Sequence, residues 1–574
     1  MIKRLLGYVQ EYKKASLITP LFMIGEVLME ILLPFLMAFI IDEGVNKGDM
    51  SKVVLYGVIM LVCALLSLMC GALAGKLAAY ASGGFAKNVR RALFYKIQDF
   101  SFKNIDKFST SGLVTRLSTD ITNIQNAYQM VLRMCIRAPL TLICAMSMTF
   151  YINSSLASVF LYAAIFLGIV LFFVTKFAHK TFEEVFDKYD DLNASVQENI
   201  TNMRVVKAYV KEKDETVKFK KASYSVYKMF KKAENIVIFN TPAMQLAMYA
   251  CIIAISWLGA KMIVSSTLTT GELMSMLTYT ANILMSLMML SMIFVMMTMS
   301  LASVKRIDEV LKEEIDLVNP QEPIYQLEDG SIEFDHVSFK YNLDGPDNNL
   351  DDICVSIKSG ETIGLIGGTG SAKSTFVQLI PRLYDITSGS LKVGGHEVNE
   401  YDLETLRNEV SMVLQKNVLF SGTIKDNLRW GNLQATDEEI KKACHQACAD
   451  EFIDKMKDGY DTYIEQGGSN VSGGQKQRLC IARALLKKPK ILILDDSTSA
   501  VDTGTDAMIR KAFREELPNT TKIIISQRIS SIEDTDRIIV LDDGKIDGIG
   551  SHEELLKTNK IYQEVYETQV KGGE

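Results

Sequence analysis

Long apolar runs separated by polar stretches fill the first 300 residues of the chain, whereas short β-rich segments alternate with helical ones from Ile332 onward. Six of the apolar runs are close to the ~20 residues that a helix needs to cross a bilayer. We expect membrane spans at 16–41, 53–75, 136–153, 155–176, 239–263 and 273–299. The pattern therefore predicts a multidomain fold, in which an all-α domain with six transmembrane helices precedes an α/β domain.

The polar stretches between the spans differ in length and in charge. The first, third and fifth are short, whereas the second and fourth run to roughly sixty residues and carry basic residues such as Arg90, Arg116, Arg204 and Lys211. Because cytoplasmic loops of membrane proteins are rich in basic residues, we expect the N-terminus, both long loops and the α/β domain in the cytoplasm of a multi-pass plasma-membrane protein. The long loops contain mostly helix formers, so the helices are expected to continue beyond the membrane.

The length and charge of the chain set further limits. With 574 residues it exceeds one ordinary core, and Pro320 and Pro323 mark a linker in a turn-rich stretch. We expect a transmembrane domain over 1–318, a linker over 319–330 and a second domain over 331–574. The net charge of −6 argues against a nucleic-acid partner. Cys444, His445 and Cys448 lie close together, but without further ligands nearby they do not predict a zinc site.

A phosphate-binding loop follows the strand-like segment ETIGLIG. Its residues are Gly367, Gly368, Thr369, Gly370, Ser371, Ala372, Lys373, Ser374 and Thr375. They resemble the pattern GxxxxGK[ST], in which backbone N–H groups and the following helix N-terminus hold nucleotide phosphates. Lys373 would reach the outer phosphates, and the Ser374 hydroxyl would help to hold Mg²⁺. Ala372 replaces the usual glycine, which is tolerable unless the backbone there needs a positive φ.

Two more motifs follow in a fixed order. The first is Ser472, Gly473, Gly474 and Gln475, and the second is the apolar strand ILILDD, which places Asp495 near Mg²⁺. A phosphate loop, SGGQ and an acid-terminated strand in this order are highly specific. Along essentially its full length, the chain resembles one half of an ATP-binding cassette (ABC) exporter. The resemblance implies ATP and Mg²⁺ as cofactors and ATP hydrolysis that drives transport.

The resemblance also assigns roles to further residues. Tyr341 would stack on the adenine, Gln415 would lie near Mg²⁺, and Asp502 would belong to the loop after the catalytic strand. Segments near Phe102–Ile105 and Ala208–Lys211 would be the coupling helices between the two domains. In this family two nucleotide domains enclose two ATP molecules, each between one subunit's phosphate loop and the other's SGGQ.

Two departures from the family pattern lie at the chemical centre. Asp496 stands where a glutamate usually positions the attacking water, and Gln527 stands where a histidine usually contacts the γ-phosphate. Aspartate is one methylene shorter, and glutamine cannot carry charge. With Lys373 these are the candidate catalytic residues, and we expect this site to bind ATP but to hydrolyse it weakly. An intact SGGQ then predicts a heterodimer, in which a second exporter half supplies the glutamate and the histidine.

Two other interpretations remain open. The chain can be a homodimeric lipid or drug flippase in which Asp496 is sufficient for hydrolysis. It can also be a regulatory subunit that binds nucleotide and gates a partner without turnover. The fusion of six spans to an ATPase favours an exporter over an importer.

The predicted spans contain candidate cargo contacts. Glu26 and Glu30 lie four residues apart on one face of the first span and are taken as the only charged side chains well inside any span. They form either a site for cationic or polar cargo or a structural contact with a neighbouring helix or aqueous cavity. In the sixth span, a stripe at helical spacing serves either cargo binding or packing; it comprises Met285, Met288, Met292, Met296 and Met299. These residues do not identify the cargo, and drug-like amphiphiles, lipids and peptides all remain open. We expect a small amphiphilic or drug-like molecule, hydrophobic or cationic, with membrane lipid as a further partner.

Overall fold

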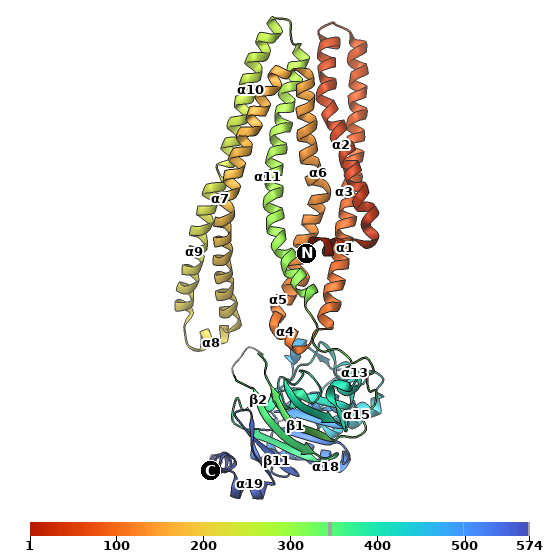
Figure 1. Cartoon of the computed structure of the whole chain (residues 1–574), viewed down its shortest axis with the longest axis vertical. Helices are drawn as coiled ribbons and strands as arrows, with labels where there is room; N and C mark the ends of the chain where they lie inside the picture. Colours follow the sequence, from red (N-terminus) through yellow and green to blue (C-terminus); the bar gives the residue numbers. More distant parts are fainter. Residues whose placement is uncertain (343–346, 498, 572–574) are drawn as a thin grey trace. The chain divides into compact units, whose positions relative to one another are not determined.

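A computed structural model describes residues 1–342, 347–497 and 499–571 of the chain. The chain forms two compact units. One, here called the helical unit, comprises Met1–Gln98 and Ser109–Glu313. The other, the sheet unit, comprises Asp99–Phe108 and Glu314–Glu574. Figure 1 shows long helices throughout the first unit and the β-strands in the second.

The helical unit consists of long helices joined by short turns (Figure 1). Its helices are α1 (Ile2–Gly7), α2 (Lys13–Phe39), α3 (Met50–Gln98), α5 (Thr110–Thr115), α6 (Ile121–Ile152), α7 (Ser154–Thr201), α8 (Met203–Ala208), α9 (Glu212–Val237), α10 (Asn240–Val264) and α11 (Thr270–Lys312). A short π-helical turn, η2 (Ile40–Val45), continues α2. With 49 and 48 residues, α3 and α7 extend well beyond a bilayer, as the long polar loops predicted.

Six helical stretches among the described residues are long and apolar enough to cross a membrane. They are Gln10–Val45, Met50–Gln98, Thr110–Ile152, Ser154–Val174, Glu212–Val264 and Thr270–Phe294. This confirms the six predicted spans. Capping side chains stabilise two of the turns between the spans. Asn153 accepts a hydrogen bond from the backbone N–H of Leu156 at the start of α7. Thr269 forms a capping box with Glu272 at the start of α11.

The sheet unit contains two larger sheets and a short strand pair. The antiparallel sheet has the order β2 (Leu350–Ile357), β1 (Ile332–Phe339), β4 (Ser388–Val393), β5 (His396–Glu397). The second sheet has the order β12 (Lys545–Gly550), β11 (Arg537–Asp542), β3 (Thr362–Gly367), β10 (Thr521–Ile525), β9 (Ile491–Asp495), β6 (Val410–Val413), and all its pairs except β11–β12 are parallel. The short pair is β7 (Gly422–Thr423) with β8 (Tyr463–Ile464).

Helices cover the parallel sheet, and its central strands are buried, as expected for an α/β domain. The helices of this unit that follow β1 are α12 (Lys373–Leu379), α13 (Leu403–Glu409), α14 (Ile424–Arg429), α15 (Asp437–Gln446), α16 (Asp450–Ile453), α17 (Gly473–Leu485), α18 (Thr503–Glu516), α19 (His552–Thr558) and α20 (Lys560–Lys571). Because β3, β10 and β9 are adjacent and parallel, their carboxyl ends meet at one edge of the sheet. Ligands of such sheets bind at this edge.

Candidate functional site

The phosphate-loop sequence forms the turn between β3 and α12, at the carboxyl edge of the parallel sheet. The ammonium of Lys373 donates to the carbonyl oxygens of Gly367, at 2.9 Å, and Gly368, at 2.7 Å. A Cβ at Gly367 would lie 2.1 Å from the carbonyl oxygen of Leu541, so only glycine fits there. The loop thus has the strand–turn–helix context that phosphate binding at a helix N-terminus requires.

Ala372 has a left-handed backbone, with φ 67° and ψ 23°, directly before α12. The backbone at this position therefore does need a positive φ, which is the case in which replacing glycine by alanine is unfavourable. A left-handed conformation costs a residue with a Cβ about 1–2 kcal/mol. The loop thus adopts the geometry that suits glycine and stores this strain at Ala372.

A hydroxyl and a carboxylate meet beside the loop. The hydroxyl of Ser374 donates to Oδ1 of Asp495 at 3.0 Å, which joins the start of α12 to the end of β9. Burial raises the pKa of Asp495 above its usual value and lowers that of Lys373. Oxygen ligands of this kind suit Mg²⁺, which usually takes few protein ligands and completes its shell with water and phosphate. The two side chains fit such an ion.

Asp496 and Gln527 lie next to each other in the structure. The amide nitrogen of Gln527 lies 3.5 Å from Oδ2 of Asp496. Asp496 has a positive φ of 47°, and its backbone N–H donates to the carbonyl oxygen of Ile525 at 3.1 Å. Burial raises its pKa, an effect partly offset by a hydrogen bond from Gln415 and by the positive charge of Lys373. Residues after β6, β9 and β10 thus converge on one carboxylate.

An aromatic side chain borders the same loop. The Tyr341 hydroxyl lies 3.1 Å from the Thr375 hydroxyl and donates to Oε1 of Gln378 at 3.2 Å. Its ring meets Tyr384 edge-on, with centroids 5.1 Å apart, and the residue is 42% exposed. Burial of the phenol raises the pKa of Tyr341. An exposed aromatic residue hydrogen-bonded to the loop can stack on a base whose phosphates the loop holds.

The SGGQ residues begin α17. The Ser472 hydroxyl accepts from the backbone N–H of Gln475 at 3.3 Å, and Oε1 of Gln475 accepts from the backbone N–H of Ser472 at 2.9 Å. This capping box uses both polar side chains of the motif. A Cβ at Gly474 would lie 2.8 Å from the carbonyl oxygen of Ala500, so the motif packs tightly against the loop after β9.

Asp502 caps the next helix. It accepts from the backbone N–H of Thr505 at 2.9 Å at the start of α18. The Thr505 hydroxyl also donates to Asp502, at 2.7 Å. These two hydrogen bonds lower the pKa of Asp502.

The first expected coupling segment forms α4 (Phe102–Phe108), which belongs to the sheet unit although it follows α3 in sequence. The Tyr384 hydroxyl donates to Oδ2 of Asp106 at 2.9 Å, and Asn104 donates to the carbonyl oxygen of Glu314 at 3.0 Å. Tyr384 also touches the ring of Tyr341. A continuous set of contacts therefore runs from α4 to the phosphate loop. The second segment lies where α8 ends, at Ala208.

The acids of the first span are already paired with an arginine. Nη1 of Arg137 lies 2.5 Å from Oε1 of Glu26, and its Nη2 lies 2.8 Å from Oε2 of Glu30. The statement that the acids are the only charges well inside a span was therefore wrong. Arg137 stands at the inner edge of the predicted span 136–153, but it lies mid-way along α6. The pair favours a structural contact with a neighbouring helix over a free site for cations.

Glycine makes room for this ionic cluster. Glu26 is 8% exposed, and its Oε2 has no hydrogen-bond partner among the described residues. A Cβ at Gly71 would lie 3.0 Å from the carboxyl carbon of Glu26, so the absence of a side chain at Gly71 in α3 makes room for the acid. Arg133, whose Nε is likewise buried without a described partner, lies near Gly75, one turn further along α3.

The methionine stripe on α11 is largely accessible. Met285, Met288 and Met292 are exposed, and Met296 is half-buried. The side chain of Met299 lies outside the described residues. Accessible methionines at helical spacing can bind varied apolar molecules, because the thioether side chain is flexible and polarisable.

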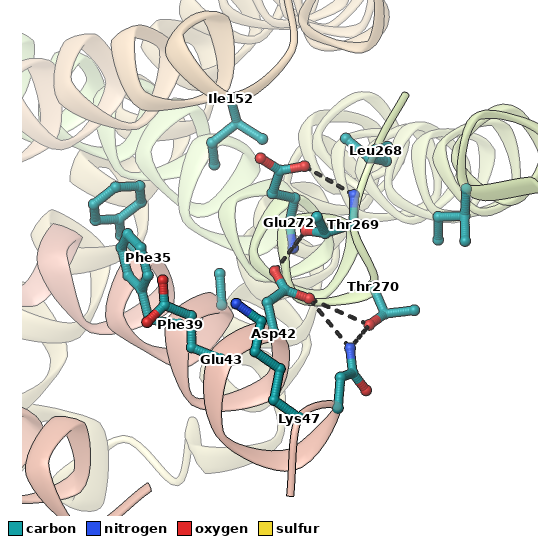
Figure 2. Close-up of a pocket in the computed structure, with 13 residues that line it drawn as sticks. Phe35, Phe39, Asp42, Glu43, Lys47, Ile152, Leu268, Thr269, Thr270 and Glu272 are labelled. Atoms are coloured by element: carbon teal, nitrogen blue, oxygen red, sulfur yellow. Dashed lines mark hydrogen bonds between the residues drawn. The ribbon is translucent and has the colours of Figure 1, made fainter. Parts of the chain in front are cut away.

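Sequence reasoning missed a cavity of about 500 Å³ beside η2 and the α10–α11 connection. Figure 2 shows Asp42 between the two segments, with dashed bonds to the connection. Its Oδ2 accepts from the Thr269 hydroxyl at 2.5 Å, and its Oδ1 accepts from the backbone N–H of Gly271 at 2.9 Å. A Cβ at Gly271 would lie 2.4 Å from the carbonyl oxygen of Ala38. The only signal in the sequence was an acid directly after the first apolar run.

Comparisons with known proteins agree with this architecture. The family described as "ABC transporter transmembrane region" matches residues 16–288, and the family "ABC transporter" matches residues 350–499. An uncharacterized ABC transporter ATP-binding protein of Bacillus subtilis, YfiB, is 37% identical over 569 residues, 99% of this chain and 98% of its own. A probable multidrug resistance ABC transporter ATP-binding/permease protein of the same organism, YheI, is 36% identical over 391 residues, 68% of this chain and 67% of its own.

A solved structure supports the fold. A bacterial Atm1-family ABC exporter with ATP bound superposes with a TM-score of 0.83, over 98% of this chain and 99% of that one, at 23% identity. At this identity the likeness concerns the fold alone.

Proposed function

The chain belongs to the ABC transporter family, as an exporter half with a membrane-spanning unit and an ATPase unit, and from this premise we propose that it is the degenerate-site subunit of a heterodimeric exporter. ATP hydrolysis drives transport in this family. The proposal concerns which of the two composite ATP sites performs it. The observation that carries it is the Asp496–Gln527 pair.

Binding and chemistry are separable in this site. Lys373, Ser374 and Asp495 supply a cation, a hydroxyl and a carboxylate for phosphate and Mg²⁺, and Tyr341 offers a ring for adenine. We assign these four residues, with the rest of the phosphate loop and Gln415, to nucleotide binding. When bound, Mg²⁺ neutralises charge that develops on the phosphates.

The catalytic positions carry weaker groups. Asp496 keeps a negative charge, but its carboxylate is one methylene nearer to the backbone than that of glutamate. Its backbone N–H is bound to Ile525, so the main chain is not free to advance and restore the reach. Gln527 offers a neutral amide, which stabilises developing charge less than an imidazolium does. We therefore expect ATP to bind and to turn over slowly.

The SGGQ motif favours a partner over a solitary chain. The capping box closes the N-terminus of its helix, and its two glycines pack against the loop after β9. The motif acts on the ATP of a facing subunit, so it is useful when that subunit has a competent site. We infer that the partner is a second exporter half with a glutamate and a histidine at the corresponding positions. We also propose that the N-terminus and the ATPase lie on the cytoplasmic side, a topology that the basic residues of the long loops support.

For the cargo we propose a small amphiphilic molecule or lipid. The exposed methionines of α11 offer an adaptable apolar surface. Glu30, at 39% side-chain exposure, and Arg137, at 29%, add a paired polar patch rather than a free negative charge. The relative YheI is named a probable multidrug resistance transporter, which fits this class of cargo.

The experiment that tests the proposal uses the chain alone in lipid nanodiscs. ATP binding and the Mg²⁺-dependent ATPase rate are measured on the same sample. Tight binding with almost no turnover is the expected result. Brisk turnover that Asp496→Asn abolishes would instead establish a homodimeric ATPase. A second experiment uses this chain together with its partner and measures transport. The variant Ser472→Arg disrupts the SGGQ motif that would act on the partner's ATP. If transport survives this change, the regulatory interpretation replaces the proposal.

A further inference from the structure

A histidine, a cysteine and two aspartates gather on the exposed surface of the β1–β2 strand pair. One ligand atom from each of Asp335, His336 and Cys354 lies within 4.8 Å of the other two. No other set of three such residues in the described part of the chain is arranged in this way. The fourth residue, Asp352, lies 2.6 Å from Nδ1 of His336.

An irregularity of the strand pair brings these side chains together. Phe334 pairs with Val355, but the next pair joins Val337 to Ile353, so β1 has one residue more than β2 between the two pairs. His336 and Asp352 both have positive φ angles, of 51° and 55°. The bulge turns Asp335 and His336 to the side on which Cys354 and Asp352 lie.

We propose that this cluster binds a divalent transition-metal ion of the zinc class. A thiolate, an imidazole and a carboxylate are the ligands that zinc prefers, and three protein ligands with one open position are common for it. Ligand atoms around a tetrahedral zinc are about 3.4–3.8 Å apart, given bonds of 2.1–2.3 Å. All three side chains are exposed and can rotate to close the difference from 4.8 Å. On binding, the thiol proton of Cys354 passes to water.

Asp352 completes the arrangement. A carboxylate bonded to one ring nitrogen of a ligand histidine fixes its tautomer and orientation for a metal on the other nitrogen. The backbone N–H of Asp352 donates to the Ser338 hydroxyl at 3.1 Å, and this bond anchors Asp352 to the opposite strand, β1. His336 therefore has an orienting partner that a lone surface histidine lacks.

A second histidine–aspartate pair in the same unit serves as a matched comparison. Nδ1 of His445 lies 2.7 Å from Oδ2 of Asp450, and the ring is exposed, as that of His336 is. The neighbouring cysteines, Cys444 and Cys448, are buried, whereas Cys354 is exposed. The exposed thiol thus distinguishes the two pairs.

The test is a Co²⁺ titration of the full chain, purified without a histidine tag and held in lipid nanodiscs. Cobalt replaces zinc and gives a thiolate-to-metal absorption band when a cysteine binds it. The expected result is a saturable band that Zn²⁺ displaces. Cys354→Ser abolishes it, and Asp352→Asn lowers the affinity about 10–100-fold. His336→Asn lowers it at least as much, whereas His445→Asn leaves it unchanged.

Three results would overturn the proposal. One is the absence of a thiolate band in the wild-type chain. Another is a band that persists in Cys354→Ser, which would place the metal on a different cysteine. The third is equal affinity in wild type and His336→Asn, which would indicate an adventitious thiol complex. Retained ATP binding in each variant shows that the sheet unit is still folded.

Discussion

The substitution Asp496→Glu should accelerate ATP hydrolysis by this chain. The added methylene moves the carboxylate outward by about one C–C bond, roughly 1.5 Å. The main chain is not expected to shift in response, because the N–H of Asp496 is bound to Ile525 at 3.1 Å. The longer side chain therefore brings the carboxylate nearer to an attacking water without a change in the loop.

The expected gain follows from how strictly such reactions depend on position. A misplacement of about 1 Å costs on the order of a hundredfold in rate. That factor equals about 2.7 kcal/mol of activation free energy, since each tenfold is 1.36 kcal/mol. We expect a 10–100-fold faster turnover for Asp496→Glu, and a further increase when Gln527→His adds a charged donor. The two gains need not multiply, because the side chains act on one centre.

The assay is steady-state ATPase activity in nanodiscs, at concentrations at which two copies pair, with the mass of each sample measured. Asp496→Asn gives the baseline without a carboxylate. Asp458→Glu lengthens an exposed aspartate in the same unit and should change nothing. If the Asp496→Glu variant is dimeric, binds ATP and still does not turn over, then the reach of this carboxylate does not limit hydrolysis and the reasoning fails.

Three further predictions concern folding and coupling. Arg137→Met should lower the thermal stability of the protein in detergent by less than the ~3–5 kcal/mol of a fully buried ion pair, because the Arg137 side chain is 29% exposed. Adding Glu26→Gln should restore part of the loss, and equal melting of wild type and Arg137→Met would contradict this. Ala372→Gly should stabilise the ATPase unit in urea by about 0.5–1 kcal/mol, because the relief of a left-handed φ exceeds the entropy lost by glycine. Tyr384→Phe removes the bond to Asp106 and should speed hydrogen exchange in α4, and unchanged exchange would mean that this bond does not hold the helix.

The nucleotide motifs could be placed from the sequence because their geometry is local. The phosphate loop follows one strand and begins one helix, and Asp495 ends a run of apolar residues. Only the order of parallel strands was needed to bring them together, and that order follows from the fold. The strain at Ala372 was not visible, since a φ angle depends on the turn and not on the residue type alone.

Contacts between distant segments could not be predicted in the same way. Arg137 lies 111 residues from Glu26 in the sequence, so no local pattern connects the two. In the hydropathy pattern, Arg137 looks like the polar end of a span. The sequence drew attention to Cys444, His445 and Cys448, which are close in the sequence, at the end of α15 and just beyond it. The structure instead brings Asp335, His336 and Cys354 together. They meet at a bulge in the pairing of β1 with β2, and the sequence does not specify that pairing.

The changed residues are not spread evenly over the ATP site. Tyr341, Lys373, Ser374 and Asp495, which would hold nucleotide and Mg²⁺, keep the types that the family resemblance implies, and Ala372 is the exception in the phosphate loop. The other two unusual groups, Asp496 and Gln527, lie side by side, with the amide nitrogen of Gln527 3.5 Å from Oδ2 of Asp496. A subunit that only needed to be inert could lose any of these groups. Under the proposed function, a subunit that binds ATP, closes on a partner and leaves hydrolysis to the other site would change the groups at the chemical centre and keep most of its phosphate contacts. Asp496 and Gln527 fit that expectation.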